Sequence, residues 1–350
     1  SWNIAKLLQA PDALAAVPHV PGTASIDKIL KATRSKGAPE AVLKEVRDAA
    51  HQFEQMVEIH VGDRPTLDLI IDGLATNGAA GLDPSRKRAF HGNTGIYGVQ
   101  AKTYMMSCYL APNPDEPDLI DMVMMRGYVA LRRLRPTVRI PVFRIRQWSA
   151  SGQAIGTQQW QPLEDEGGPL LPSFSRGDIP EIEAVGVDGG VDYVLQPGPI
   201  GNRGAFDCFL GDMLRAGASR FRTDNDTTGE FGATVTVPSE QMVFDLIAHK
   251  DVAFALKASS HVYASYFTHE QSDGEWDDAA RLPIRQAASE LAGSPPAVAT
   301  PMIPRYSEMQ AYVFDRLGWT ASEFRGVRLQ MKYPPLGATI IQRFELPTAR

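Results

Sequence analysis

The spacing of apolar residues changes partway along this chain, and that change limits the folds it can adopt. Between residues 39 and 61, apolar residues recur at steps of three and four, as on one face of an α-helix: Leu43, Val46, Ala50, Phe53, Val57 and Val61. Pro39 precedes this stripe and Gly62 follows it, which are usual signals for a helix start and end. After Pro136, the segment 138–146 is rich in β-branched residues and favours a strand. Helices followed by strands, without alternating βαβ units, predict an α+β fold.

The other segments divide between the two patterns. Helical spacing predicts further helices at 66–74, 85–106, 239–264, 283–291 and 305–317. Strand-like runs predict strands at 138–146, 191–195, 205–210, 231–237, 327–333 and 339–346. The expected order is therefore a helical N-terminal third, a mixed or antiparallel sheet in the middle, and helices with a terminal strand pair at the C-terminus.

The segment between Ala111 and Pro136 is the most favourable place for a domain boundary. We expect a helical region at 1–125 and an α+β region at 126–350, packed together as one unit. The apolar face from Leu43 to Val61 has no repeat partner nearby in the sequence. It is therefore expected to be buried against the C-terminal region.

Composition excludes several classes of protein. The 350 residues include 35 Lys and Arg against 41 Asp and Glu, a net charge of -6, so the chain as a whole is not built to coat nucleic acid or an anionic membrane. Apolar runs are too short for a membrane span, and the N-terminus lacks a signal-peptide pattern. Cys108 and Cys208 are too few for a disulfide framework. A cytoplasmic protein without a membrane partner is expected.

The strong catalytic and cofactor motifs are missing from the sequence. It contains no phosphate-binding Gly-x-x-x-x-Gly-Lys-Ser/Thr loop, no His-Glu-x-x-His zinc motif and no Gly-x-Ser-x-Gly elbow, so we expect no cofactor and no metal. His51, Glu54 and Glu58 could offer ligands from one helix face, but an ordinary solvated face is favoured. The two cysteines have no basic neighbours in the sequence and are interpreted as buried small side chains.

Arginines form the densest charge feature. Six lie within fifteen residues: Arg132, Arg133, Arg135, Arg139, Arg144 and Arg146. Arginine binds carboxylates and phosphates through two parallel hydrogen bonds, so one interpretation is an anionic-ligand pocket or a nucleic-acid patch. The favoured alternative is pairing with the acidic stretch 164–192. Because three arginines before Pro136 exceed what capping a helix end needs, Arg132 or Arg135 is expected to be partly buried against carboxylates.

Two weaker features carry open alternatives. The segment 198–204 is rich in glycine, but Pro199 lacks the N–H that a phosphate loop would use, which favours a tight turn. Asp245 precedes His249 by four residues in a predicted helix. This pair is either a carboxylate that orients a functional histidine or an ordinary i,i+4 contact.

Several short segments together resemble the long C-terminal region of a group of bacterial helix-turn-helix transcriptional regulators. They are HVGDRPTLD at 60–68, AFHGN at 89–93, YGVQA at 97–101, LRRLRP at 131–136, FDLIAH at 244–249, PRY at 304–306, GW at 318–319 and YPP at 333–335. The resemblance covers 37–347. In that group a small DNA-binding head comes first. The segment before Gly37 holds no evident recognition helix, and the chain starts at Ser1, so we expect the head to be absent here.

The resemblance implies the effector or oligomerisation region of a regulator. Its expected partners are a small anionic ligand and further copies of the chain, with nucleic acid reached only through the absent head. The candidate ligand-binding residues are Arg132, Arg133, Arg135, Arg144, Asn93 and His249; no catalytic residue is assigned. Two alternatives stay open: an enzyme with a site near His249 and the arginine strand at 132–146, or a structural interaction domain.

Overall fold

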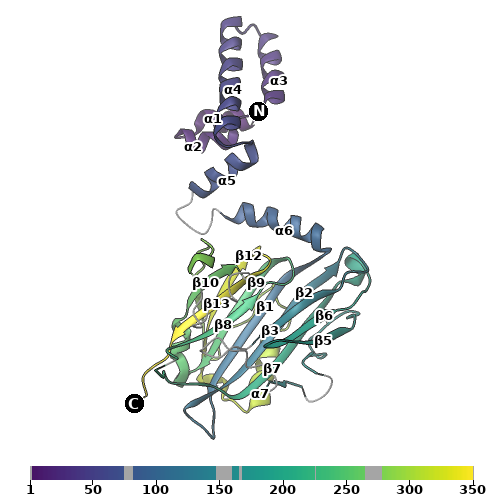
Figure 1. Ribbon diagram of the computed structural model, residues 1–350, viewed down its shortest axis with the longest axis vertical. Coiled ribbons are helices and arrows are strands. Elements are labelled where there is room, and N and C mark those ends of the chain that lie inside the picture. Colours follow the sequence, from purple (N-terminus) through teal and green to yellow (C-terminus); the bar gives the residue numbers. More distant parts are fainter. Residues whose placement is uncertain are drawn as a thin grey trace. The chain divides into compact units, whose positions relative to one another are not determined.

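The computed structural model describes residues 2–74, 82–146, 160–164, 168–224, 226–264 and 278–349, and the chain divides into two compact units, 1–85 and 86–350 (Figure 1). Helices near both ends and sheets between them confirm the α+β class. The division falls at Ser85, before the segment 111–136 where the sequence predicted it. The reason is that residues 99–112 and 119–133, which were assigned largely to the helical region, form two long strands of the main sheet.

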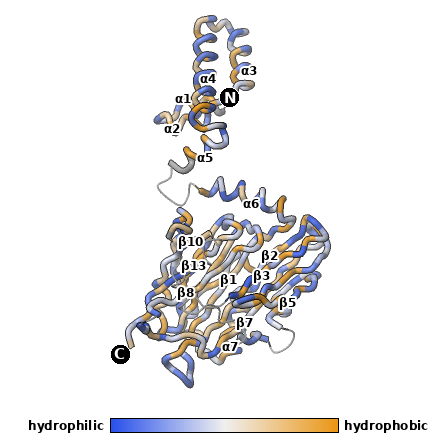
Figure 2. The backbone as a smooth tube through the Cα atoms, viewed as in Figure 1, coloured by the Kyte–Doolittle hydropathy of each residue, from blue (hydrophilic) through white to orange (hydrophobic). Residues whose placement is uncertain are grey.

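The first unit, here called the helical unit, is made of short and medium helices. They are α1 (Trp2–Gln9), α2 (Ala13–Ala16), η1 (Val17–His19), α3 (Thr23–Arg34), α4 (Glu40–His60) and α5 (Arg64–Leu74). The predicted bounds of α4 are confirmed, since Pro39 precedes it and Gly62 follows it with a φ of 99° that suits glycine. Figure 2 shows hydrophobic and hydrophilic residues alternating along α3 and α4.

The apolar stripe of α4 has partners within the helical unit. Leu43 is buried on α4, as Leu30 is on the contacting helix α3. Val57 packs in a cluster with Leu67 and Ile71 of α5. The stripe therefore uses α3 and α5 for its buried residues, whereas the sequence predicted burial against the C-terminal region.

The second unit, here called the β unit, is organised around a seven-stranded sheet with the order β11-β12-β9-β1-β2-β7-β4. Helix α6 (Asp83–Tyr97) leads into this sheet. Neighbouring strands are antiparallel except β1 and β9, which are parallel. The strands are β1 (Val99–Pro112), β2 (Leu119–Arg133), β4 (Gln161–Pro162), β7 (Phe206–Ser219), β9 (Ser239–His249), β11 (Ser289–Leu291) and β12 (Phe324–Lys332).

Different layers cover the two faces of the large sheet. Helix α7 (Tyr306–Leu317) shares a core with Met105 and Tyr109 of β1 and Val243 of β9. On the other face, Tyr128 lies against Tyr104 and against Phe143 of β3, which belongs to a small sheet. The two small sheets have the orders β3-β6-β5 and β10-β13-β8. Their strands are β3 (Ile140–Arg146), β5 (Ile182–Val187), β6 (Gly190–Leu195), β8 (Thr228–Thr234), β10 (Ser259–Ala264) and β13 (Ala338–Glu345).

Three predicted helices are wrong in whole or in part. The helix predicted at 85–106 ends at Tyr97 and continues as β1, and the segment 283–291 contains only the short strand β11. The segment 239–264 forms β9, the 3₁₀ segment η4 (Lys250–Lys257) and β10. Residues 242–248 are buried on both faces of the sheet, so their sequence is an apolar run, interrupted by Asp245, that carries no strand period.

The C-terminal elements largely follow the prediction. Helix α7 ends at Gly318, which has a φ of 66°, and both final strands are present. They do not form a hairpin, because β12 pairs with β9 and β13 pairs with β10 and β8. Among the residues that the structure describes, no helix is both long and apolar enough to cross a membrane.

Candidate functional site

The end of β2 lies beside the glycine-rich turn at 198–204. Arg132 is the register partner of Gln100 at the start of β1, and Arg133 forms a parallel bridge with Ile200 in the turn. Residues 201–204 form the 3₁₀ segment η3 (Gly201–Gly204). The fold thus joins two features that are far apart in the sequence. It also corrects the expected helix-to-strand junction, since both arginines belong to a strand.

Arg132 is held by uncharged acceptors. Its Nη1 donates to Oδ1 of Asn202 at 2.7 Å. With its side-chain oxygen turned toward the guanidinium, Gln100 accepts from Nε at 2.9 Å and from Nη2. The Arg132 side chain is partly exposed, and the neighbouring Arg203 is exposed. Two amides therefore fix the orientation of Arg132 without neutralising its charge.

Arg133 points to the other face of the strand and is only 1% exposed. Its Nη1 and Nη2 donate to the backbone carbonyls of Val138 and Gln196, and its buried Nε has no hydrogen-bond partner among the described residues. Burial lowers the pKa of Arg133. A buried guanidinium with only neutral acceptors is unusual, because an unpaired charge is costly to remove from water.

Arg135 caps the end of α6. It donates to the backbone carbonyls of Gly95 at 2.6 Å and Ile96 at 3.1 Å, which helix geometry leaves without helical partners. Asn93 lies on α6 two residues before Gly95. Because the acceptors of Arg132 and Arg135 are amides and backbone carbonyls, the expectation that one of them is buried against a carboxylate is wrong.

The other arginines of the cluster pair with carboxylates, as the favoured alternative predicted. In the β3-β6-β5 sheet, Arg139 binds Glu183 at 2.6 Å, and Asp192 lies 3.7 Å from Arg144 and 2.7 Å from Arg146. Arg144 is thus a candidate ligand-binding residue that already has a counter-ion. The cluster divides into paired arginines on this small sheet and three arginines near the end of β2 with neutral acceptors.

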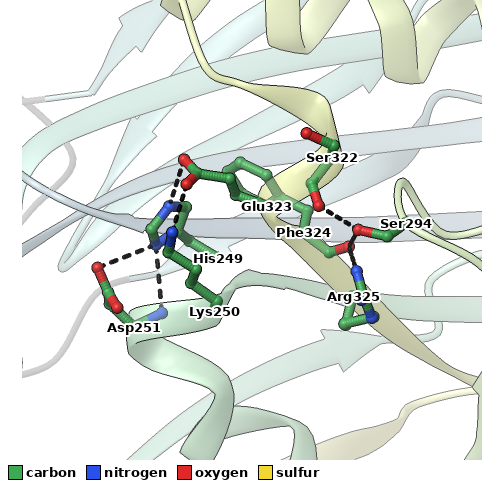
Figure 3. Close-up of polar contacts among 8 residues, drawn as sticks. All are labelled: His249, Lys250, Asp251, Ser294, Ser322, Glu323, Phe324 and Arg325. Atoms are coloured by element: carbon green, nitrogen blue, oxygen red, sulfur yellow. Dashed lines mark hydrogen bonds and ion pairs between the residues drawn. The ribbon is translucent and has the colours of Figure 1, made fainter.

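His249 ends β9 and connects three segments (Figure 3). Its Nδ1 accepts from the backbone N–H of Asp251 at 3.2 Å, and its Nε2 lies 3.0 Å from Oε2 of Glu323. Glu323 also binds Nζ of Lys250 at 2.5 Å. Hydrogen bonds from Lys250 and His249 lower the pKa of Glu323. Both ring nitrogens are therefore engaged in holding η4 to η7 (Ala321–Glu323).

Neither sequence-based role of His249 matches this arrangement. The predicted helical contact with Asp245 is wrong, because the segment is a strand and Asp245 binds Arg328. Figure 3 also shows Ser294, whose hydroxyl donates to the backbone carbonyls of Ser322 and Phe324 and not to the imidazole.

The sheet register separates His249 from Arg132, the first arginine of the strand that the alternative enzyme site included. Leu110 pairs with Ala248, next to His249, whereas Gln100 pairs with Arg132. Ten residues along β1 correspond to about 33 Å. His249 and Arg132 consequently lie toward opposite ends of the sheet and cannot share one catalytic site.

A buried polar network under α7 escaped the sequence analysis. Asp245 is fully buried and accepts two hydrogen bonds from Arg328, at 2.8 and 2.6 Å, and one from the Tyr306 hydroxyl at 2.7 Å. Burial raises the pKa of Asp245, while Arg328 and Tyr306 oppose that change. The register places Ser107, Asp245 and Arg328 in one row across β1, β9 and β12. Nothing in the local sequence around Asp245 could have revealed this pairing.

An open groove of about 400 Å³ lies beside this network, between α7 and residues 295–298. Pro295, Pro296 and Phe314 give it an apolar lining, and Asp315 is the charged residue among those that line it. The side-chain amide of the buried Gln310 donates a hydrogen bond to the backbone carbonyl of Pro296. The groove therefore presents no set of converging titratable groups.

The groups that could bind a metal ion or react as a thiol are placed as follows in the described residues. Among them, no three His, Cys, Asp or Glu side chains are grouped to hold a metal ion, and Glu54 of the α4 face accepts the Thr23 hydroxyl. Cys108 and Cys208 are buried, and burial raises the pKa of the Cys208 thiol to about 12. A thiol with a raised pKa is a poor nucleophile and metal ligand.

Comparisons with known proteins give only distant structural similarities. The sequence matches no protein-family model and no curated protein. A putative protease from Parabacteroides distasonis matches 71% of this chain at 6% identity and a TM-score of 0.30. An M1 zinc metallopeptidase from Deinococcus radiodurans matches 70% at 8% identity and a TM-score of 0.24. The chain spans about two fifths of the length of these proteins, 40% and 42% respectively. No argument about function rests on similarities this low.

Proposed function

We propose that this chain is the effector and oligomerisation region of a bacterial transcriptional regulator, and that α4 of the helical unit joins two copies of it. The sequence segments at 60–68, 131–136 and 244–249, among others, support the assignment to regulators. One observation on α4 supports the proposed oligomerisation. A row of apolar side chains with coiled-coil spacing lies on this helix, and the rest of the helical unit leaves the row largely uncovered. Symmetric dimers are common among soluble oligomers and match palindromic operators.

The row, here called the α4 seam, runs along most of the helix. Its apolar residues follow one another at steps of four and three, Val42, Val46, Ala49, Phe53 and Met56, and the polar His60 occupies the next position of the row. Val42 is 48% exposed, Val46 43% and Met56 39%, whereas Phe53 is half-buried. An alternation of four and three is the heptad pattern by which helices pack together over their length. The 21 residues of α4 provide three heptads, about 31 Å of helix.

The neighbouring helices of the same unit leave this seam open. Leu43 and Val57, which lie beside the seam on α4, are 2% and 7% exposed because α3 and α5 pack on that side. The heptad spacing points to a helix as the missing partner. A second copy of α4 supplies a helix with the same repeat.

Side-chain size favours an antiparallel arrangement of the two copies. When two α4 helices run in opposite directions about a two-fold axis near residue 51, Ala49 faces Phe53 of the second copy and Val46 faces Met56. Small residues then oppose large ones, which fills the interface evenly. A parallel arrangement would place Phe53 against Phe53 and Ala49 against Ala49, leaving a gap beside a crowded layer.

The oligomeric state of the whole chain tests the proposal. We expect a dimer by light scattering coupled to size-exclusion chromatography, and a monomer for the double variant Val46→Glu with Met56→Glu. The matched control is Lys44→Glu with His51→Glu, which alters exposed residues on the opposite side of α4 and should leave the dimer intact. A monomeric unmodified chain at about 100 μM would overturn the proposal, since a useful dimer should form below that concentration.

The orientation has its own test. Gln52 lies beside the two-fold axis of the antiparallel register, so Gln52→Cys should yield a disulfide-linked dimer under mild oxidation. Cys108 and Cys208 are buried and should not contribute. Failure to cross-link while the dimer persists would point to a parallel pair.

The proposal gives this chain no sequence-specific DNA contact of its own. We expect no specific band shift with duplex fragments at nanomolar protein and low salt, where nonspecific electrostatic attraction is strongest. Specific binding under those conditions would contradict this part of the proposal.

A further inference from the structure

Arginines near the end of β2 differ from the others of the cluster in their hydrogen-bond partners. Arg139, Arg144 and Arg146 bind carboxylates, and Arg126 binds Asp212 at 2.7 Å. Arg132, Arg133 and Arg135 bind only amide or backbone oxygens among the described residues. The end of β2 therefore carries three positive charges within four residues, and no carboxylate of the described residues binds them.

We propose that this end of the sheet binds a phosphate group between Arg132 and Arg203. Asn202 and Gln100 hold the Arg132 guanidinium through their oxygens, so its orientation is fixed while its charge stays available. A guanidinium presents parallel N–H groups that match two oxygens of a phosphate. Arg203 follows Asn202 directly, is exposed, and makes no hydrogen bond or ion pair with the described residues.

Two features of the surroundings favour a dianion over a monoanion. Arg133 places a further positive charge beneath this surface, where burial weakens screening by solvent. Its Nε has no hydrogen-bond partner in the part of the chain that the structure describes, so the charge is not dispersed through a complete set of hydrogen bonds. A phosphate monoester or inorganic phosphate carries close to two negative charges near neutral pH. The ligand class is therefore a phosphate, free or as the head of a small metabolite.

The inference rests on the proposed function only in treating this ligand as an effector. Binding belongs to the β unit, whereas self-association belongs to α4 of the helical unit. Either can fail without the other, and the two are measured separately.

Isothermal titration of the whole chain with inorganic phosphate, at constant ionic strength set by chloride, tests the site. The informative variant is Asn202→Asp, which keeps the size of the side chain but gives Arg132 a carboxylate partner. We expect this change to weaken phosphate binding at least about tenfold. Arg203→Gln should weaken it by a similar factor, through loss of the second guanidinium.

The matched control removes an arginine of the same cluster that is already paired. Arg139→Gln should leave the phosphate affinity unchanged, because Arg139 is neutralised by Glu183. Equal weakening in Arg139→Gln and Arg203→Gln would show a general charge effect and overturn the site. Absence of phosphate binding to the unmodified chain at 10 mM, about the weakest useful range for a metabolite, would also overturn it.

Two further ligands identify the chemistry that the site recognises. Glycerol phosphate should bind at least as well as inorganic phosphate if the natural ligand is a phosphate monoester. Succinate should bind more weakly, because its carboxylates carry their charges on separate groups. Stronger binding of succinate than of either phosphate would overturn the assignment to phosphate.

Discussion

The two units of this protein differ in how completely they cover their apolar side chains. Of the large hydrophobic side chains that are exposed among the described residues, eight lie in the helical unit and five in the much longer β unit. Those of the helical unit are Leu8, Leu14, Val42, Val46, Met56, Ile59, Leu69 and Ile70. Apolar surface concentrated on a small unit is typical of an element that another surface completes.

The β unit shows the opposite property, because it encloses charged groups as well as apolar ones. Asp121, Arg126, Asp212 and Asp245 are each less than 9% exposed, and each has an ionic partner. Buried charges persist only when hydrogen bonds and counter-ions replace the lost water. The β unit thus supplies the partners of these four buried charges itself, whereas the helical unit leaves part of its apolar face exposed.

Carboxylates also stabilise two bulges, one in β2 and one in β7. Ala130 and Ala216 have φ values of 50° and 48°, in the left-handed region that alanine rarely adopts. The backbone N–H of Ala130 donates to Asp207, and that of Ala216 donates to Asp121. At each bulge, a carboxylate on the neighbouring strand therefore stabilises the left-handed backbone conformation of the alanine.

The largest effect should come from breaking the buried pair of the β unit. Asp245→Asn leaves the Arg328 guanidinium buried without its counter-ion, and we expect a loss of about 3–5 kcal/mol in the free energy of unfolding. Urea denaturation followed by tryptophan fluorescence measures it. Asp245→Leu combined with Arg328→Met and Tyr306→Phe should recover most of the loss, since neither hydrogen-bond donor to the carboxylate then stays buried without an acceptor. An Asp245→Asn loss below about 1 kcal/mol would show that the network is not important for stability.

The next largest effect belongs to the helical unit and separates its buried side from the α4 seam. Leu43 is 2% exposed, so Leu43→Ala should cost about 2–5 kcal/mol through lost contacts and a cavity. Val46→Ala alters a side chain that is 43% exposed and should cost less than about 1 kcal/mol in the monomer. Hydrogen exchange of the α3–α5 amides distinguishes the two. Comparable losses would mean that Val46 is covered within a single chain.

A pH dependence should follow from the contacts of Glu323 in the β unit. The folded state lowers the pKa of Glu323 below its ordinary value of 4.5, so the carboxylate contributes stability above that value. This contribution is lost as the pH falls through the lowered pKa. The melting temperature should therefore fall below pH 4.5 less steeply in Glu323→Gln than in the unmodified chain. Identical slopes would show that the His249 and Lys250 contacts contribute nothing measurable.

The smallest effect should be local to the end of α6. Arg135→Met removes the donors to the carbonyls of Gly95 and Ile96, and cations at this end of a helix contribute about 0.3–1 kcal/mol. We expect faster hydrogen exchange in the last turn of α6 and no change in the strands of the β unit. Exchange that accelerates across β1 and β2 as well would assign Arg135 a wider role than capping.

The sequence alone determined the elements that keep one face in water. Helices α4 and α7 and the strand β12 were predicted within a few residues, because exposed and buried positions alternate with a readable period. The pairing of Arg139, Arg144 and Arg146 with the acidic stretch was also predicted. Oppositely charged side chains on neighbouring strands interact favourably, so an arginine-rich strand and an acidic segment tend to form ion pairs.

Only the tertiary structure decided that β9 is a strand and which groups surround Arg132 and Arg133. Residues 242–248 are buried on both faces, so no period distinguished a strand from a helix. The neutral acceptors of Arg132 and Arg133 come from β1, the 198–204 turn and segments after β2 and β6, and strand pairing brings these together from distant parts of the chain. Local spacing encodes which face of an element meets water, but it does not encode which distant segment lies beside it, because sheet register is set by the packing of the whole core.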